Sequence, residues 1–366
     1  MSTGKPLNPF TPNKIFQHPR RIAQWQETGT CMPVVIEFDL TNACDNFCPW
    51  CFGYKGLNRQ DKKTWHKGNV GQNWTLNEAR DMLFQVREFG IKAVTFTGGG
   101  EPLVSPICIE AIEYADELGL DVALVTNGNR LNAERSERIL KCCTWTRISV
   151  DATDAEEYRR EHGVGRWDAL RKNICEMVRI KNEKGYECTI GIGYLTNGNN
   201  TDRVMKFAAL GREWGVDYAQ FRPMLIGWAT KAVDYTETGI VKAIRFAEQE
   251  YSTDSYSVLC SEHKYNRIEQ GKLKRDYDKC CGHHFVAVIA ADHKMYVCCH
   301  MRGMEKYCIG DLRQSSLASI WFSKRRLGID NAIDVHSFDC PPLCRADSFN
   351  TILAQIEKPV EHRNFI

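Results

Sequence analysis

The chain has 366 residues, of which 43% are hydrophobic and 26% charged, and its formal net charge is +2. These proportions are those of a globular protein, and they exclude a disordered, collagen-like or coiled-coil chain. The near-neutral charge gives no overall field that would hold nucleic acid, so a nucleic-acid partner is not indicated. No stretch approaches the roughly 20 apolar residues that span a bilayer, and the N-terminus lacks the apolar segment of a signal peptide. We therefore expect a cytoplasmic protein without a membrane partner.

Short β-branched runs alternate with amphipathic helical patterns between residues 34 and 224. The strand-like runs are Val34–Leu40, Lys92–Phe96, Asp121–Thr126, Thr146–Val150, Glu187–Tyr194 and Asp217–Arg222. Helix patterns lie between them, for example Leu76–Phe89 and Pro106–Leu118. Six strands joined largely through helices predict βαβ units around a parallel sheet, either a partial barrel or a doubly wound sheet. In both architectures, the chemistry belongs at the carboxyl ends of the strands.

The pattern changes after about residue 227, where the chain becomes rich in loops and cysteine. The elements expected there are helices over Glu237–Glu250 and Ser316–Arg326 and short strands over Phe285–Ala290 and Met295–Val297. A small segment of this kind would gain stability from bound metal. We therefore expect three parts: an irregular N-terminal arm (1–33), a core barrel (34–227) and an auxiliary domain (228–366).

The 17 cysteines are the most informative residues, because a chain of this length does not need disulfide staples. In a reducing cytosol, clustered thiols indicate metal binding or catalysis. Five cysteines lie within apolar helix or strand patterns and are expected to fill the core: Cys108, Cys142, Cys143, Cys175 and Cys188. Most of the others fall into two groups.

The first group follows the first predicted strand and has the spacing C-x3-C-x2-C, formed by Cys44, Cys48 and Cys51. Closely spaced thiolates on irregular backbone can converge on an iron–sulfur, zinc or copper(I) centre. A structural zinc site requires four ligands, and no fourth cysteine or histidine follows nearby. Three thiolates on a [4Fe–4S] cluster would leave one iron open to a small molecule.

This motif, with the aromatic Phe52 directly after its third cysteine, resembles the radical S-adenosylmethionine (SAM) superfamily. The resemblance implies an α/β fold, a partial (β/α)6 TIM-like barrel, in which the open iron binds the amino and carboxylate groups of SAM. An electron, supplied by a donor such as flavodoxin or ferredoxin, then cleaves SAM to methionine and a 5′-deoxyadenosyl radical. The cofactors supply this chemistry, and the protein supplies orientation and exclusion of water.

Further motifs stand at the ends of later predicted strands, in the order that the family shows. The run Thr97-Gly98-Gly99-Gly100-Glu101-Pro102 matches the family's glycine-rich turn, in which backbone approaches a ligand closely and a carboxylate faces a cationic amino group. The resemblance implies that SAM is positioned by Gly98, Gly99, Gly100, Glu101, Ser149, Asp151 and Arg222. For Arg222, at the end of the sixth strand, a structural salt bridge or contact with substrate remains an equal alternative.

The second group lies near the C-terminus: Cys280-Cys281, Cys298-Cys299 and the C-x3-C pair Cys340 and Cys344. It is similar to the SPASM and twitch extensions of radical SAM enzymes. The resemblance implies an auxiliary [4Fe–4S] cluster on Cys281, Cys298, Cys340 and Cys344, with Cys280 and Cys299 as alternates. An all-cysteine zinc site is the competing interpretation. Cys260 and Cys308 stay open as spare ligands, buried thiols or hydrogen-atom donors.

Together these motifs predict a radical SAM oxidoreductase or isomerase that abstracts hydrogen from a small molecule or a peptide. The alternatives are an isomerase that remodels a hypermodified thymidine in phage DNA, a maturase of ribosomal peptides, and a non-enzymatic protein with structural zinc or iron. Residues 1–33 are too short for a domain that binds a peptide leader, which favours a small molecule. Metal content separates the enzymatic and structural hypotheses.

Overall fold

A ten-stranded, mostly parallel sheet forms the centre of the protein, in the order β10-β9-β8-β1-β2-β3-β4-β5-β6-β7. It is seen in a computed structural model that describes residues 10–51, 72–224, 238–270, 275–337, 340–341, 343–358 and 361–362. Six neighbouring strands follow the order of the chain: β1 (Val35–Phe38), β2 (Ala93–Phe96), β3 (Asp121–Thr126), β4 (Cys143–Ser149), β5 (Thr189–Thr196) and β6 (Tyr218–Pro223). All six predicted strands are confirmed.

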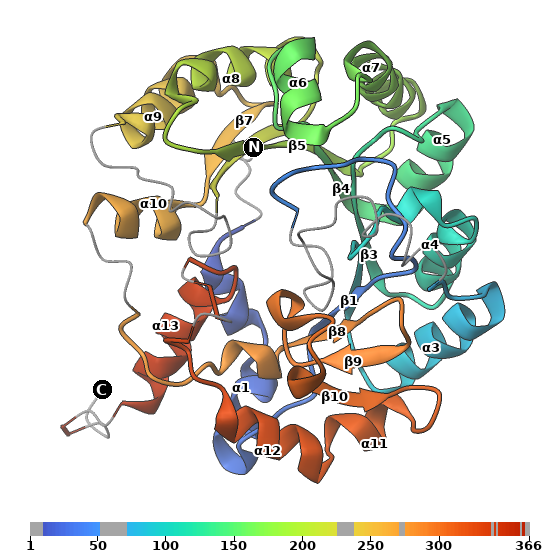
Figure 1. Ribbon diagram of the computed structural model, residues 1–366, viewed down its shortest axis with the longest axis vertical. Helices are drawn as coiled ribbons and strands as arrows, with labels where there is room; N and C mark the ends of the chain where they lie inside the picture. The colour runs from blue at the N-terminus through green and yellow to red at the C-terminus, as the bar shows by residue number, and fades with distance from the viewer. Residues whose placement is uncertain are drawn as a thin grey trace.

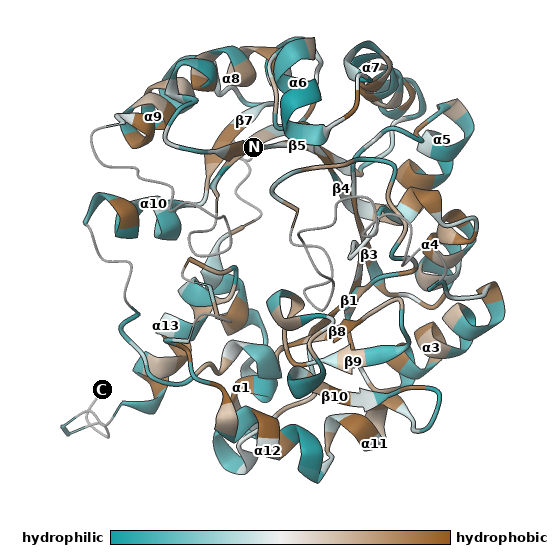
Figure 2. Ribbon diagram, viewed as in Figure 1, coloured by the Kyte–Doolittle hydropathy of each residue, from teal (hydrophilic) through white to brown (hydrophobic). Residues whose placement is uncertain are grey.

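Helices cover the outer side of this curved sheet, and the arrangement is a partial (β/α)6 barrel (Figure 1). They are α3 (Leu76–Glu88), α4 (Cys108–Glu117), α5 (Ala133–Cys142), α6 (Ala155–His162), α7 (Trp167–Lys184), α8 (Val204–Glu213) and α9 (Ile240–Tyr251). Figure 2 shows apolar and polar residues side by side on these helices, as expected of elements with one face on a core. Helix α3 begins with a capping box in which Thr75 and Glu78 bond each other's backbone N–H groups.

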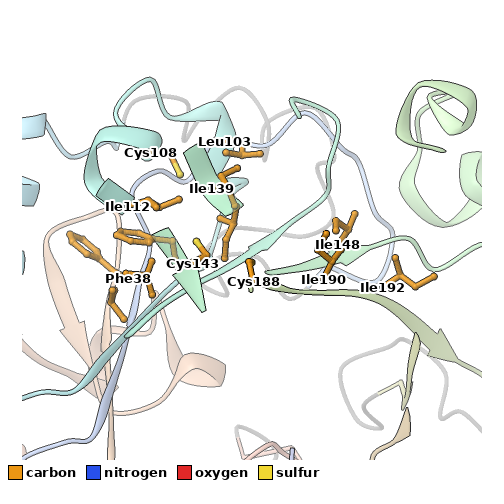
Figure 3. Close-up of a cluster of buried hydrophobic side chains, with 14 of the residues drawn as sticks. Phe38, Leu103, Cys108, Ile112, Ile139, Cys143, Ile148, Cys188, Ile190 and Ile192 are labelled. Carbon is orange, nitrogen blue, oxygen red and sulfur yellow. The ribbon is translucent and has the colours of Figure 1, made fainter. Parts of the chain in front are cut away.

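The main core lies between the sheet and this ring of helices. Figure 3 shows side chains such as Phe38, Ile112 and Ile190 packed together there, all fully buried. Three of the five cysteines predicted to fill the core, Cys108, Cys143 and Cys188, are buried in the same cluster, and Cys142 and Cys175 pack against its edge. The prediction for these five residues is confirmed, which removes them from the list of candidate ligands.

The C-terminal segment extends the same sheet at both edges. Strand β7 (Ser257–Cys260) pairs with β6, and β8 (Val286–Ile289) pairs in parallel with β1. Strands β9 (Lys294–Tyr296) and β10 (Cys308–Asp311) complete an antiparallel edge. The two short strands predicted here are confirmed as β8 and β9, whereas the sequence pattern did not predict β7 and β10. The proposed boundary at residue 227 lies outside the described residues.

The N-terminal arm differs from the irregular segment that we expected. Its described part forms a 3-10 helix, Pro12–Gln17, and the helix α1 (Pro19–Thr28). Ile15, Ile22 and Trp25 pack in a second apolar cluster that also contains Leu353 of α13 (Asp347–Glu357). The arm is therefore folded onto the C-terminal helix, a long-range contact that local sequence does not reveal.

The expected helix over Ser316–Arg326 is two helices, α11 (Leu317–Trp321) and α12 (Lys324–Ala332). The break occurs because the Ser323 hydroxyl accepts a hydrogen bond from the backbone N–H of Arg326 and begins a new helix. A further helix, α10 (Glu262–Glu269), follows β7. Among the described helices, none has both the length and the apolar character that a bilayer crossing requires.

Candidate active site

The loop after β1 carries the first cysteine group and runs along the carboxyl ends of the barrel strands (Figure 1). Cys44 and Cys48 are half-buried, and Cys51 is exposed. Burial raises the pKa of Cys44 to about 12 and raises that of Cys48 further, and the charge of Cys51 adds to both shifts. The negative charge of one thiolate therefore opposes that of the next unless a metal centre binds them. Three thiolates are the donor set that an open iron–sulfur cluster requires. Phe52 lies outside the described residues.

The glycine-rich turn after β2 is bonded to this cysteine loop. The backbone N–H of Glu101 donates to the Ala43 carbonyl at 2.8 Å, and that of Gly99 donates to the Asp39 carboxylate at 3.1 Å. A Cβ atom at Gly100 would lie 2.3 Å from the Ala43 carbonyl oxygen. Only glycine permits this approach. The structure thus brings Gly98, Gly99 and Gly100 against the cysteine loop.

Glu101 joins the ends of two strands. Its carboxylate accepts hydrogen bonds from the Thr126 hydroxyl at 2.5 Å and from the backbone N–H groups of Asn127 at 2.6 Å and Leu103 at 3.0 Å. Burial raises the pKa of Glu101 to about 7, although these bonds oppose the shift. The carboxylate therefore orders the ends of β2 and β3. A contact with the SAM amino group would use its remaining acceptor capacity.

Ser149 and Asp151 stand where β4 ends, as predicted. Asp151 has a left-handed backbone (φ 48°), and its carboxylate accepts a hydrogen bond from the Leu195 N–H at 2.7 Å. A strained residue held in this way is typical of a functional strand end. His162, at the end of α6, lies beside it: Nε2 is 3.7 Å from the Asp151 carboxylate and 2.9 Å from the Val150 carbonyl.

His162 also contacts the cysteine loop, a role that was not predicted from the sequence. Its Nδ1 is 3.2 Å from the Cys48 sulfur and 3.3 Å from the Asn46 amide nitrogen, and the ring is 3% exposed. It connects a predicted cluster ligand with the end of β4. A lone histidine in an amphipathic helix carries no sequence signal for such a role.

Asp45, between the first two cysteines, is held by residues of two other segments, the turn after β3 and the turn before α7. Its carboxylate accepts hydrogen bonds from the Asn127 amide at 2.7 Å and from Arg130 and Arg166 at 3.1 Å each. Burial alone would raise the pKa of Asp45, but these partners and Asn129 outweigh it and lower the pKa. The Thr126-Asn127-Gly128 motif is thus bound to the cysteine loop through Asp45. This contact was not predicted from the sequence.

A polar cavity of about 400 Å³ borders the same loop. Pro49 and Trp50 line one side, and residues of α6 and of the turn after β5, such as Glu161 and Asn197, line the other. The indole N–H of Trp50 donates to Glu161 at 3.0 Å. Trp50 is therefore partly exposed at the cavity and does not belong to the core.

Four cysteines of the second group gather near α13: Cys280, Cys298, Cys340 and Cys344. Burial raises the pKa of Cys280 to about 12, and the charges of Cys344 and Cys298 add to it. Burial likewise raises the pKa of Cys340, and the charges of Cys344, Cys280 and Cys298 add to this shift. The backbone of the C-x3-C pair is fixed by Arg275, which donates to the carbonyls of Cys340 and Pro341. These four thiols form a second donor set.

Cys281, the residue predicted to complete this set, is not brought together with the other three. Its thiol lies in the apolar cluster under the N-terminal arm, 3.9 Å from the Glu357 carboxylate. Asn350 explains the difference, because its side-chain oxygen accepts the N–H groups of Cys281 and Gly282 while its amide donates to the Cys280 sulfur at 3.3 Å. Cys280, the alternate of the doubled pair, thus joins the other three thiols.

Cys260 and Cys308 lie apart from the two sets, whereas Cys299 lies beside the second set. Cys260 ends β7, and its charged neighbours are the carboxylates of Glu262, Glu248 and Glu269 and the guanidinium of Arg245, with no thiol among them. Cys308 is buried with Tyr296 and contacts the Gly310 carbonyl at 3.7 Å. Cys299 is the neighbour of Cys298 and is close to Cys344, so it lies at the margin of the second set.

Comparison with known proteins agrees with this geometry. Residues 38–210 match the family model of the radical SAM superfamily, and residues 280–346 match that of SPASM, an iron–sulfur cluster-binding domain. The mycofactocin maturase of Mycobacterium ulcerans is 30% identical over 198 residues, which are 54% of this chain and 49% of the relative. The PqqA peptide cyclase of Streptomyces rochei is 26% identical over 200 residues, with shares of 54% and 50%. The chain spans about half the length of these relatives.

Among solved structures, the protein SuiB of Streptococcus suis, crystallised with its precursor peptide SuiA, superimposes with a TM-score of 0.64. The match covers 90% of this chain and 73% of SuiB at 14% identity, so it supports the fold. A SuiB structure bound to SAM matches equally well. The two family matches therefore identify a radical SAM domain and a SPASM domain in this chain, and such domains imply SAM, a SAM-binding [4Fe–4S] cluster and auxiliary iron–sulfur as cofactors.

Proposed function

We propose that this protein cleaves SAM reductively at a cluster held by Cys44, Cys48 and Cys51 and uses the resulting radical to take a hydrogen atom from its substrate. One observation carries the proposal: the cysteine loop is hydrogen-bonded to the glycine turn at Glu101, and His162 links the loop to the end of β4 beside Asp151. The bound cofactors would supply an electron and a 5′-deoxyadenosyl radical. The chain itself supplies three thiolates and the hydrogen-bonded strand ends around them.

The spacing of the thiols supports a cluster rather than a single zinc ion. A tetrahedral zinc with Zn–S bonds of about 2.3 Å draws its sulfur ligands to about 3.8 Å from one another. In the part of the chain that the structure describes, only His283, His284 and Asp330 bring three ligand atoms within 4.8 Å of each other. Neither of the described cysteine sets brings three sulfur atoms within 4.8 Å of one another, and this counts against the structural-zinc alternative.

For the auxiliary centre, the proposed ligands are Cys280, Cys298, Cys340 and Cys344. Cys280 replaces Cys281 of the sequence-based set because of the contacts described above. This centre would accept or return an electron during turnover, or shape the substrate pocket. A cytosolic location, with thiols kept reduced and an electron donor such as flavodoxin or ferredoxin at hand, forms part of the same proposal.

The relatives support a peptide as the substrate, because one of them is named a peptide cyclase and SuiB was crystallised with a precursor peptide. The oxidoreductase or isomerase outcome of the reaction belongs to the proposal and depends on the substrate. A small molecule, the other substrate class that the sequence analysis favours, is tested in the same assay. Hydrogen abstraction would transfer deuterium from a labelled substrate to 5′-deoxyadenosine in either case.

The test is release of 5′-deoxyadenosine from SAM by the reduced, reconstituted protein. Cys48→Ala should abolish the release and remove about four irons per chain, because it takes one of three cluster ligands. Cys175→Ala, a half-buried thiol on α7, is the matched control and should retain both. Unchanged release from Cys48→Ala would overturn the proposal.

A further inference from the structure

The inner face of the barrel presents polar side chains from three adjacent strands. In the strand register, Arg147 of β4 lies opposite Gly191 of β5, which lies opposite Tyr218 of β6. Arg222 follows on the same face of β6 because side chains alternate along a strand. The opposite face of these strands, with Ile148, Ile190 and Ile192, packs into the helix-covered core in Figure 3.

Two glycines of β5 give these side chains room. A Cβ atom at Gly191 would lie 1.9 Å from the Tyr218 ring. A Cβ atom at Gly193 would lie 3.1 Å from a terminal nitrogen of Arg222 and 3.7 Å from Cδ of Arg147. The two guanidinium side chains therefore come together over Gly193.

A third cation faces this pair from α10. Lys264 is only 9% exposed, and burial together with the charges of Arg222 and Arg147 lowers its pKa to about 8. The charges of Cys344, a proposed auxiliary ligand, and of Asp347 oppose this shift. Lys264 therefore lies near both the arginine pair and the second cysteine set.

These three cations lack a direct counter-ion within the described part of the chain, and Asp347 and Asp151 act on Lys264 and Arg147 only at longer range. No carboxylate there forms an ion pair with them, and the only side-chain bond of Arg147 is to the Gln220 amide oxygen at 3.0 Å. Nε of both arginines and the hydroxyl of Tyr218, a residue only 1% exposed, are buried without a partner. By contrast, Arg302 and Arg345 pair with Glu37 on the inner face of β1.

We infer that Arg147, Arg222 and Lys264 bind an anionic group of the substrate, a carboxylate or a phosphate, inside the barrel. This inference rests on the proposed function and specifies the substrate class. Guanidinium groups match both anions with paired N–H donors, and buried cations without counter-charge are costly unless such a ligand binds. Tyr218 would add a neutral donor. A group bound there lies between the arginines of the strands and the side of Cys344.

The test uses the full-length protein with its clusters and SAM, titrated by calorimetry with succinate and, separately, with inorganic phosphate. Each anion should bind the wild type, and the tighter one identifies the source of the charge. Arg222→Gln and Lys264→Gln should each weaken binding at least tenfold. Arg245→Gln, which removes an exposed arginine of α9 that pairs with Glu269 of α10, is the control and should bind as the wild type does.

A second readout separates ligand binding from a merely structural role. Without added anion, Lys264→Gln should raise the melting temperature because it relieves repulsion among three cations, whereas loss of a structural contact would lower it. Succinate and phosphate should raise the melting temperature of the wild type more than that of the variant. These measurements do not depend on catalysis, so they can fail while the wild type still releases 5′-deoxyadenosine.

Two results would overturn the inference. One is that neither anion binds the wild type, or that both bind Arg222→Gln and Lys264→Gln as well as the wild type. The other is that these variants weaken SAM binding by the same factor as anion binding, since the cations would then serve the cofactor.

Discussion

Neighbouring residues of this chain have very different chemical environments. The side chains of the neighbouring Cys280 and Cys281 point in different directions. Asn350 fixes these directions by accepting the backbone N–H groups of Cys281 and Gly282. The sequence reveals the pair but not which thiol turns toward Cys340 and Cys344. Predicting that choice requires the position of α13, 70 residues further along the chain.

Paired variants test this assignment. Cys280→Ser should lose the auxiliary centre and reduce the iron content from about eight to about four per chain, because a cluster ligand is gone. Cys281→Ser should keep the full iron content, since the Cys281 thiol lies in an apolar cluster away from the other three thiols. Iron analysis after anaerobic reconstitution measures both. Retained iron in the first variant and lost iron in the second would reverse the assignment.

The connecting turns determine the site at the scale of elements. The run of three glycines, the strand ends and the three-cysteine spacing were all visible in the sequence, because each follows a clear β-branched run. The hydrogen bonds that unite them were not visible, since Asp45, Asn129 and His162 are ordinary polar residues until the turns meet. Local patterns thus predict elements and motifs, and tertiary contact assigns their partners.

Gly100 tests how tightly two of these turns are joined. Gly100→Ala would place Cβ 2.3 Å from the Ala43 carbonyl oxygen and 2.6 Å from the Asn42 carbonyl carbon, so the cysteine loop must shift. We expect stability to fall by about 1–3 kcal/mol, as for overpacked sites, with weaker SAM binding. Chemical denaturation and calorimetry provide the measurements. Gly165→Ala meets nothing within 4 Å and should behave like the wild type.

For the whole molecule, the C-terminal segment and the N-terminal arm are built into the barrel rather than appended to it. Strand β8 pairs with β1, and a buried network joins His284, which follows Cys280 and Cys281, to Arg326 of α12 and Thr30 of the arm. Asp330 lies 3.5 Å from His284 and completes it. The composition change near residue 227 marks a change of pattern along one continuous sheet.

This network predicts a pH dependence of stability. Burial lowers the pKa of His284 to about 3. The unfolded chain therefore takes up a proton near pH 6.5 that the folded chain refuses, and stability is lost as the pH falls below that value. The loss approaches about 1.4 kcal/mol per pH unit for one such group. Denaturant unfolding at pH 7.0 and 5.5 should show a larger drop for the wild type than for His284→Gln. Equal drops would contradict the prediction.

The central claim is that Cys44, Cys48 and Cys51 leave one iron of their cluster open to SAM. Electron paramagnetic resonance of the reduced Cys280→Ser protein, which should hold only this cluster, tests the claim most directly. We predict that adding SAM shifts the signal of the cluster, because the sulfonium ligand binds the open iron. A signal that SAM leaves unchanged would contradict the account.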